Sequence, residues 1–167
     1  MKKILMSACL LGNKVRYDGG SLTVADGMVE QWRSAGRVVS VCPEVAAGMS
    51  IPRKPAEIAG GDGNRVLSGE AEVIDNTGDK VTSAFIAGAN VALALCRQFN
   101  IEVAVLAEHS PSCGSAAIYD GGFSGRKIPG MGVTAALLRR HGIQVFNQHQ
   151  IAEANRALLG AQETPPD

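Results

Sequence analysis

The stretch IEVAVLAEHSPSCGS, residues 101–115, joins an aliphatic run to a polar loop that carries Cys113. A short aliphatic run that ends in serine, proline and glycine predicts a buried strand leading into a tight, functional loop. Pro111 fixes one backbone torsion and removes a donor, and Gly114 permits a turn that a Cβ would block. Three serines, Ser110, Ser112 and Ser115, stand close to Cys113 in the sequence. We therefore expect its thiol in a polar environment, unlike that of a cysteine that only packs in a core.

Two further apolar runs end at cysteines in the same way. Residues 2–8 lead into Cys9, and residues 37–41 lead into Cys42. The carboxyl ends of parallel strands lie along one edge of an open sheet, and ligands bind at that edge. We therefore expect Cys9, Cys42 and Cys113 to converge there as three thiolates.

Length and composition are typical of one globular domain. The chain has 167 residues, enough for a substantial core, and 16 lysines and arginines balance 16 aspartates and glutamates. This balance gives no net field that would attract nucleic acid or a membrane surface. No apolar segment approaches the roughly 20 residues that span a bilayer, and the first apolar run is too short for a signal peptide. We expect a cytoplasmic protein whose cysteines stay reduced and serve metal binding or chemistry.

Predicted strands and helices alternate along the chain. The strands are residues 2–8, 37–41, 101–107 and 143–146, and the helices are residues 24–35, 79–99, 133–140 and 150–159. This alternation predicts an α/β fold in a single domain over residues 1–160. Its sheet is expected to be open, mostly parallel and Rossmann-like (doubly wound), with helices on both faces. Residues 161–167 are expected to form a flexible tail.

Two connecting segments have the composition of irregular structure. Residues 56–76 contain short β-like pieces at 65–67 and 71–74, which predict a small β-hairpin excursion over the site. Residues 116–125 are rich in glycine and predict a loop able to close over a ligand. Thr77 to Asp79 supply candidate N-caps for the helix over 79–99.

The three cysteines at strand ends admit three interpretations. They are unrelated buried thiols, a zinc site with His109 as a fourth ligand, or the ligands of an iron–sulfur cluster. A cubane held by three thiolates leaves one iron open to substrate. No two of these cysteines form a Cys-x-x-Cys pair, but spacing alone does not separate zinc from a cluster. Cys96 falls at a core position of the helix over 79–99 and is expected to pack there.

Other polar residues near these cysteines are candidates for chemistry. Glu44 is either a surface carboxylate or a proton donor or base in the cysteine pocket. Ser110 and Ser112 either cap the turn or orient a substrate. Glu108 is a candidate ion-pair partner. Three cations are either solvated or suited to an anionic group such as a phosphate. They are Arg16, Arg53 and Lys54.

Several short motifs together resemble the thiouracil desulfidase (TudS) family. They are SACLLG (7–12), VRYDG (15–19), VCPE (41–44), IPR (51–53), EI (57–58), SPSCGS (110–115), IYDG (118–121) and GVTAALL (132–138). The similarity covers about residues 2–147, and the combination is specific.

The resemblance implies an enzyme with a 4Fe–4S cluster that is held by the three cysteines at strand ends and has one open iron. It implies removal of sulfur from thiolated uracil compounds (thiouracil, 4-thiouridine or its monophosphate), with release of sulfide and no net redox change. The family's catalytic glutamate and serine fall on Glu44 and Ser110, with Ser112 only two residues away. Substrate contacts are expected from four residues. They are Arg16, Tyr17, Ser112 and Ser115.

Two other functions fit the same cysteines. One is a regulatory or structural protein that binds zinc or senses redox state. The other is an iron–sulfur lyase or dehydratase that acts on hydroxy acids through an open iron. In the enzymatic interpretations the partner is a small molecule, and neither a membrane nor a nucleic acid is expected. The sequence indicates no oligomeric state.

Overall fold

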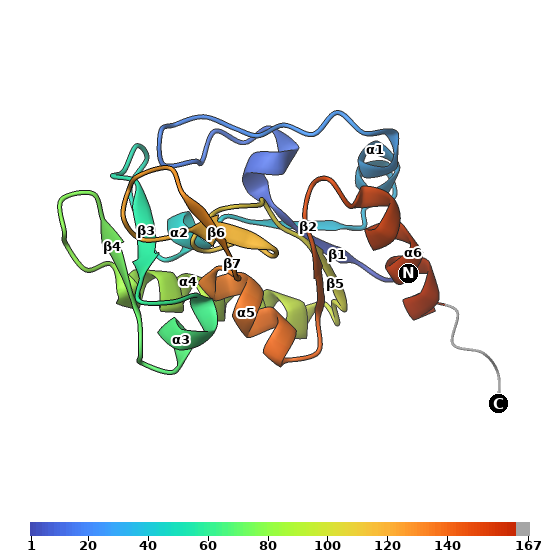
Figure 1. The fold of residues 1–167 in the computed structure, drawn as a ribbon. Coiled ribbons are helices and arrows are strands. Elements are labelled where there is room, and N and C mark those ends of the chain that lie inside the picture. Colours follow the sequence, from blue (N-terminus) through green and yellow to red (C-terminus); the bar gives the residue numbers. More distant parts are fainter. Residues whose placement is uncertain (163–167) are drawn as a thin grey trace.

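The computed structural model describes residues 1–162 and has a four-stranded parallel sheet at its centre (Figure 1). The strands are β1 (Ile4–Ser7), β2 (Val38–Val41), β5 (Val103–Val105) and β8 (Gln144–Phe146), in the order β2-β1-β5-β8. Leu5 of β1 pairs with Val39 on one side and with Ala104 on the other. Every residue of β1 and β5 is buried. Strands covered on both faces read as continuous apolar runs, which is why these two were visible in the sequence.

Four helices cover the sheet. They are α1 (Gly27–Ser34), α4 (Thr82–Gln98), α5 (Val133–Arg140) and α6 (Ile151–Gln162). Helix α4 packs against α5 and α1 contacts α6, and the two pairs lie on opposite sides of the sheet (Figure 1). Right-handed crossovers produce this arrangement when the strand order reverses next to β1. The predicted open, parallel α/β fold with helices on both faces is confirmed.

The apolar side chains form two clusters. The larger one surrounds the sheet and includes Trp32, Leu106 and Leu138. The smaller one includes Ile58, Val73, Phe85 and Ile118, and it attaches the segments outside the sheet to α4.

The excursion over residues 56–76 is an antiparallel hairpin, as predicted. Strand β3 (Ala56–Ala59) pairs with β4 (Glu72–Asp75). The β-like interpretation of residues 65–67 was wrong, because the helix α3 (Gly63–Leu67) occupies the connection. Asp62 caps α3 by accepting a hydrogen bond from the backbone N–H of Asn64. A Cβ on Gly63 would lie 2.3 Å from the carbonyl oxygen of Gly132, so this approach of α3 to the start of α5 requires glycine.

A second hairpin contains the glycine-rich loop predicted over residues 116–125 as its turn. Strand β6 (Ala117–Tyr119) pairs antiparallel with β7 (Lys127–Pro129). The turn between them is fixed by Glu57 of β3, whose Oε1 accepts from the N–H of Gly121 at 3.0 Å and of Phe123 at 3.2 Å. The predicted glycine-rich loop is confirmed over residues 120–125, which form the turn of the hairpin. Residues 117–119 were not predicted to be paired, because their partner strand is only three residues long.

Several element ends differ from the predictions. Helix α1 begins at Gly27, where Asp26 caps it, and not at residue 24. Helix α4 begins at Thr82, and the predicted cap residues instead form a turn in which Thr77 and Asp79 donate to Asp75 Oδ1. Two short elements follow the first two strands, η1 (Ala8–Leu11) and α2 (Pro43–Ala46). The tail predicted over 161–167 overlaps the end of α6, and its remainder lies outside the described residues.

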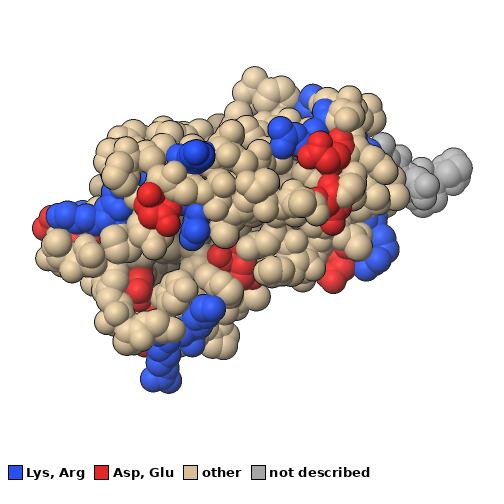
Figure 2. All heavy atoms as spheres, turned by 90° about the horizontal axis from the view of Figure 1, so that it is seen from above, with Lys and Arg blue, Asp and Glu red and all other residues tan. Residues whose placement is uncertain are grey.

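Charged side chains are dispersed over the face drawn in Figure 2, where lysines and arginines alternate with aspartates and glutamates. This pattern agrees with the balanced count in the sequence. Of the helices in residues 1–162, none combines the length and the hydrophobicity that crossing a membrane requires.

Candidate functional site

A cavity of about 420 Å³ lies at the carboxyl edge of the sheet. All three cysteines that follow strands line it. Cys9 lies in η1 after β1, Cys42 lies between β2 and α2, and Cys113 lies in the loop after β5. The reversal of strand order between β1 and β5 opens this edge, which is the usual place for a ligand in an open α/β sheet. The predicted convergence of the three cysteines on one site is therefore what the structure has.

The three thiols are free and lie in a low-dielectric environment. Burial raises the pKa of Cys9 to about 11, against the opposing effect of the Arg16 guanidinium. Burial and the nearby Glu44 carboxylate raise the pKa of Cys42, and the same two causes raise the pKa of Cys113 well above its ordinary value. Without metal the three groups are thiols at neutral pH, and iron or zinc displaces their protons on binding.

The donor set of the cavity is suited to a soft metal centre. Three cysteine thiols line it, and thiolates are the ligands that both structural zinc ions and iron–sulfur clusters take. Among residues 1–162, no cluster of three or more His, Cys, Asp or Glu side chains has the arrangement of a site for a single metal ion.

Helix α2 brings Glu44 to the cavity. Cys42 is its N-cap and Pro43 its first residue, where the missing N–H costs nothing. The helix packs closely on α4, because a Cβ on Gly88 would lie 2.3 Å from the carbonyl oxygen of Pro43. The backbone of Glu44 is therefore held next to Cys42 in the wall of the cavity.

Glu44 forms an ion pair with Arg53. Arg53 Nη2 lies 3.1 Å from Glu44 Oε2, and the two side chains are only 8% and 13% exposed. Arg53 Nη1 donates to the carbonyl oxygens of Val15 at 3.1 Å and Ser50 at 3.3 Å. The other carboxylate oxygen, Glu44 Oε1, is buried and has no hydrogen-bond partner. A buried acceptor without a partner is costly unless a ligand or water satisfies it.

Ser110 lines the cavity, and its Oγ accepts hydrogen bonds from the backbone N–H groups of Ser112 at 3.0 Å and Cys113 at 3.2 Å. A serine hydroxyl has two acceptor sites and one proton. With both acceptor sites occupied, the Ser110 hydroxyl has only its proton left to donate.

Ser112 and Ser115 do not line the cavity. Ser112 is fully buried, and its hydroxyl pairs with Thr134 at 2.8 Å. Ser115 is buried and its hydroxyl donates to Glu108 Oε2 at 3.3 Å. These contacts hold the loop, so the position of both side chains favours a structural role over the predicted contact with substrate.

Arg16 and Tyr17 line the cavity, as expected of substrate contacts. The guanidinium carbon of Arg16 lies 5.9 Å from the centre of the Tyr17 ring. The backbone N–H of Arg53 donates to the carbonyl of Tyr17 at 2.7 Å, which ties this loop to the segment after α2.

Three residues at the cavity were misjudged or missed. Arg53 was expected to be solvated or to bind an anion, whereas it holds Glu44. Glu108 is buried and accepts hydrogen bonds from backbone N–H groups and Asn147, and it makes no ion pair with a lysine or arginine in the described part of the chain. Burial opposes its ionisation, but these donors outweigh burial and lower the pKa of Glu108. Gln148 also lines the cavity, and nothing in its sequence context marked it.

His109, the candidate zinc ligand, lines the cavity at a backbone φ of +71°. Its ring is edge-on to Tyr119, with centroids 6.4 Å apart. Burial and the nearby Lys127 lower the pKa of His109. Cys96 is 2% exposed in the core on α4, as predicted.

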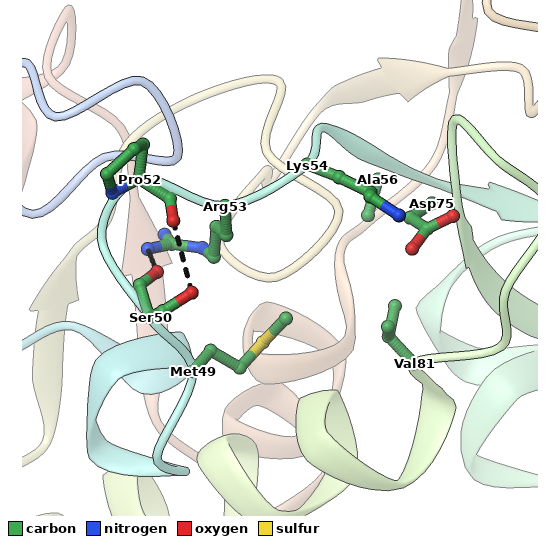
Figure 3. Close-up of a pocket in the computed structure, with 8 residues that line it drawn as sticks. All are labelled: Met49, Ser50, Pro52, Arg53, Lys54, Ala56, Asp75 and Val81. Carbon is green, nitrogen blue, oxygen red and sulfur yellow. Dashed lines mark hydrogen bonds between the residues drawn. The ribbon is translucent and has the colours of Figure 1, made fainter.

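A second pocket of about 560 Å³ adjoins this cavity and shares Met49, Arg53, Lys54 and Ala56 with it. Figure 3 shows Ser50, Pro52 and Arg53 on one side of this pocket and Lys54 beside Asp75 on the other. Arg53 donates to Glu44 and two carbonyls, whereas Lys54 Nζ donates to Thr77 Oγ1 at 3.2 Å beside Asp75. An ammonium has three donors, so Lys54 is the cation of this pocket with donors left for a ligand.

Comparisons with known proteins agree on one family. The family model described as 2-thiouracil desulfurase matches residues 4–150. The chain is 43% identical to the uncharacterized protein YbbK of Bacillus subtilis (strain 168) over 148 residues, which is 89% of this chain and 97% of that protein. It is also similar to a solved structure of the [4Fe-4S]-dependent thiouracil desulfidase TudS. That match has 45% identity and a TM-score of 0.87, and it covers 95% of this chain and 99% of the other.

Proposed function

The chain belongs to the 2-thiouracil desulfurase family, and from this premise we propose that it replaces the sulfur of a thiolated uracil compound by oxygen. In this reaction water supplies the oxygen, the C–S bond breaks, and the sulfur leaves as hydrogen sulfide. Atoms and electrons balance without an oxidant or a reductant. The substrate is a small molecule, and the enzyme works in the cytoplasm, where thiols stay reduced.

Cys9, Cys42 and Cys113 are the residues that would hold a 4Fe–4S cluster. Their common cavity and the preference of iron–sulfur clusters for cysteine thiolates support this assignment. When bound, such a cluster supplies an iron without a protein ligand, a soft Lewis acid suited to thiocarbonyl sulfur. The similar solved structure is named as a [4Fe-4S]-dependent enzyme, which supports the same cofactor here.

The unpartnered oxygen of Glu44 is the observation that carries this proposal. Oε1 is buried in the wall of the cysteine cavity, while Arg53 holds Oε2. An attacking water must lose a proton as it bonds to the sulfur-bearing carbon, and Oε1 is the acceptor available for it. Arg53 holds Oε2 and so leaves Oε1 as the carboxylate oxygen without a protein partner.

Ser110 complements Glu44. Since its acceptor sites are occupied by the N–H groups of Ser112 and Cys113, its hydroxyl can only donate toward the substrate. We assign it to the pyrimidine ring, where it stabilises charge that develops on a ring nitrogen or oxygen during attack. The same geometry favours Ser110 over Ser112 as the catalytic serine.

The adjoining pocket supports a substrate larger than a free base. A pyrimidine in the cysteine cavity would direct its substituent past Lys54 and Met49, which line both cavities. We propose that a sugar, and a phosphate when present, occupies the second pocket beside Lys54. Arg16 and Tyr17 would then cover the base from the other side.

The test begins with anaerobic purification and measurement of iron and acid-labile sulfide per chain. We expect about four of each, as a full cubane contains. Incubation with thiouracils, 4-thiouridine and its monophosphate should then release one sulfide for each oxo product. About one zinc and no iron, or a full cluster that acts on hydroxy acids and leaves all thiolated substrates intact, would overturn the proposal.

A further inference from the structure

The buried carboxylate of Glu108 accepts six hydrogen bonds from the surrounding protein. Its Oε1 accepts from four backbone N–H groups, those of His109 at 3.1 Å, Ser115 at 2.9 Å, Ala116 at 3.2 Å and Ala117 at 3.4 Å. Its Oε2 accepts from Ser115 Oγ at 3.3 Å and from Asn147 Nδ2 at 2.7 Å. The residue is only 8% exposed. Consecutive N–H groups that converge on one oxygen form the kind of nest that elsewhere binds an anion, and here the chain's own carboxylate fills it.

This nest closes the loop that carries Cys113 and Ser110. Glu108 begins the loop directly after the strand segment, and its side chain binds residues 115–117 at the other end. Inside the loop, Ser110 Oγ accepts from Cys113 N–H, and the Ser110 carbonyl accepts from Gly114 N–H at 2.9 Å. The places of the Cys113 thiol and the Ser110 hydroxyl therefore depend on the same closed ring of hydrogen bonds.

Asn147 connects this ring to the neighbouring strand. It follows β8, and its Oδ1 accepts from the backbone N–H of His149 at 2.9 Å. That bond fixes the amide, so Nδ2 is the group that faces Glu108. The pair thus has one defined donor and one defined acceptor.

We propose that Glu108 is a positioning residue of this enzyme, which sets the place of Cys113 for the metal centre and of Ser110 for the substrate. The proposal rests on the proposed function wherever iron content or turnover is measured. The positioning of Cys113 itself is a property of the metal-free protein and stands on the hydrogen bonds above.

The 2.7 Å contact between Glu108 and Asn147 allows a test by exchange of donor and acceptor. In Glu108→Gln the backbone donors hold the amide oxygen, so its NH₂ group faces the NH₂ group of Asn147. In Asn147→Asp two carboxylates face each other. The double variant E108Q/N147D restores one donor, one acceptor and the original total charge.

The experiment measures the alkylation rate of Cys113 in reduced, metal-free protein. Trypsin separates Cys113, in the peptide 98–126, from Cys96, in the peptide 81–97, so mass spectrometry follows each thiol in the same sample. Cys113 is 4% exposed and Cys96 is 2% exposed in the core, which makes Cys96 the internal control for general unfolding. We expect each single variant to raise the Cys113 rate by about tenfold or more with little change at Cys96, because the loop opens locally. The double variant should return to within about threefold of the wild type.

Three results would overturn the inference: an unchanged Cys113 rate in Glu108→Gln, equal acceleration of Cys113 and Cys96, or a double variant no closer to the wild type than either single variant. If a single variant does not fold, the Ser115→Ala variant is used in its place. Ser115→Ala removes only the hydrogen bond from the Ser115 hydroxyl to Glu108 Oε2 at 3.3 Å. Faster alkylation of Cys113 in that variant supports the inference, and an unchanged rate counts against it.

Iron content and kcat after anaerobic reconstitution are the second readout. Both should be lower in each single variant than in the wild type, and the double variant E108Q/N147D should recover most of the loss. A wild-type protein that takes up no iron would contradict the proposed function. The alkylation rates would still decide the role of Glu108, because they need no metal.

Discussion

Arg53 Nη2 lies 3.1 Å from Oε2 of Glu44 in a pair that is almost withdrawn from solvent, and this contact leaves Glu44 Oε1 buried without a partner. The carboxylate thus has one oxygen held by Arg53 and one without a hydrogen-bond partner. In the proposed function Arg53 orients the carboxylate and Glu44 acts as the base. The two roles predict different behaviour of their variants.

Glu44→Gln should abolish most turnover while the iron content stays full. The amide keeps the size of the side chain but accepts a proton poorly, and loss of a general base lowers kcat by about 100-fold or more. Steady-state kinetics on anaerobically reconstituted protein, with iron analysis of the same sample, checks this. The control is Glu70→Gln, which changes an exposed carboxylate in a surface pair and should leave kcat unaltered. Full turnover in Glu44→Gln would remove this residue from the mechanism.

Arg53→Lys should lower kcat by about tenfold and leave iron content unchanged. Lysine keeps the charge but lacks the fork that reaches Glu44, Val15 and Ser50 at once, so the carboxylate loses its fixed direction. KM should change much less than kcat if Arg53 acts only through Glu44. A large rise in KM with constant kcat would instead mean that Arg53 binds substrate directly.

Ser110→Ala should reduce both turnover and stability. Two backbone N–H groups lose their acceptor, which costs about 1–3 kcal/mol in the free energy of unfolding, and the donor to the substrate disappears. We expect kcat to fall by about 100-fold. Urea denaturation and kinetics measure the two effects separately, with the exposed Ser124→Ala as the control for both. A loss of stability with unchanged kcat would restrict Ser110 to a structural role.

Lys54→Met should distinguish substrates by their phosphate. We expect kcat/KM for 4-thiouridine monophosphate to fall by about tenfold, while the value for thiouracil changes less than about twofold. Lys80→Met is the matched control, because Lys80 is an exposed lysine paired with Glu72 outside both pockets. Equal losses for base and nucleotide would place the phosphate elsewhere.

The metal-free protein should lose stability in alkali, partly through Cys96. Burial raises the pKa of Cys96 from 9.0 to about 11. The unfolded chain then releases the proton at lower pH than the folded one, so stability is complete below pH 9 and falls as pH rises toward 11. Between these values the wild type should lose up to about 1.4 kcal/mol per pH unit more than Cys96→Ala. Urea denaturation of both proteins at several pH values in reductant measures the difference, and parallel pH profiles would contradict it.

The parallel sheet and its cysteine edge could be predicted because their signals are local. Strands buried on both faces appear as apolar runs, and three of the runs lead into a turn or loop that carries a cysteine. Pro111 and Gly114 are residue types that favour turns, and they indicated the loop after β5. The hairpin β6–β7 was missed because pairing depends on a partner strand of only three residues, and α3 was misread because a tertiary contact of Gly63 fixes it.

The polar contacts of the site were much less predictable. The sequence alone, through strand ends and a family resemblance, pointed to the residues that we propose to carry the chemistry, namely three cysteines after strands, Glu44 and Ser110. Only the tertiary structure decided that Arg53 holds Glu44 and that Glu108 holds the Cys113 loop. The physical reason is that burial of apolar side chains follows from composition and periodicity, whereas a carboxylate accepts whichever donors the folded backbone brings to it. Those donors come from segments that meet only once the chain has folded.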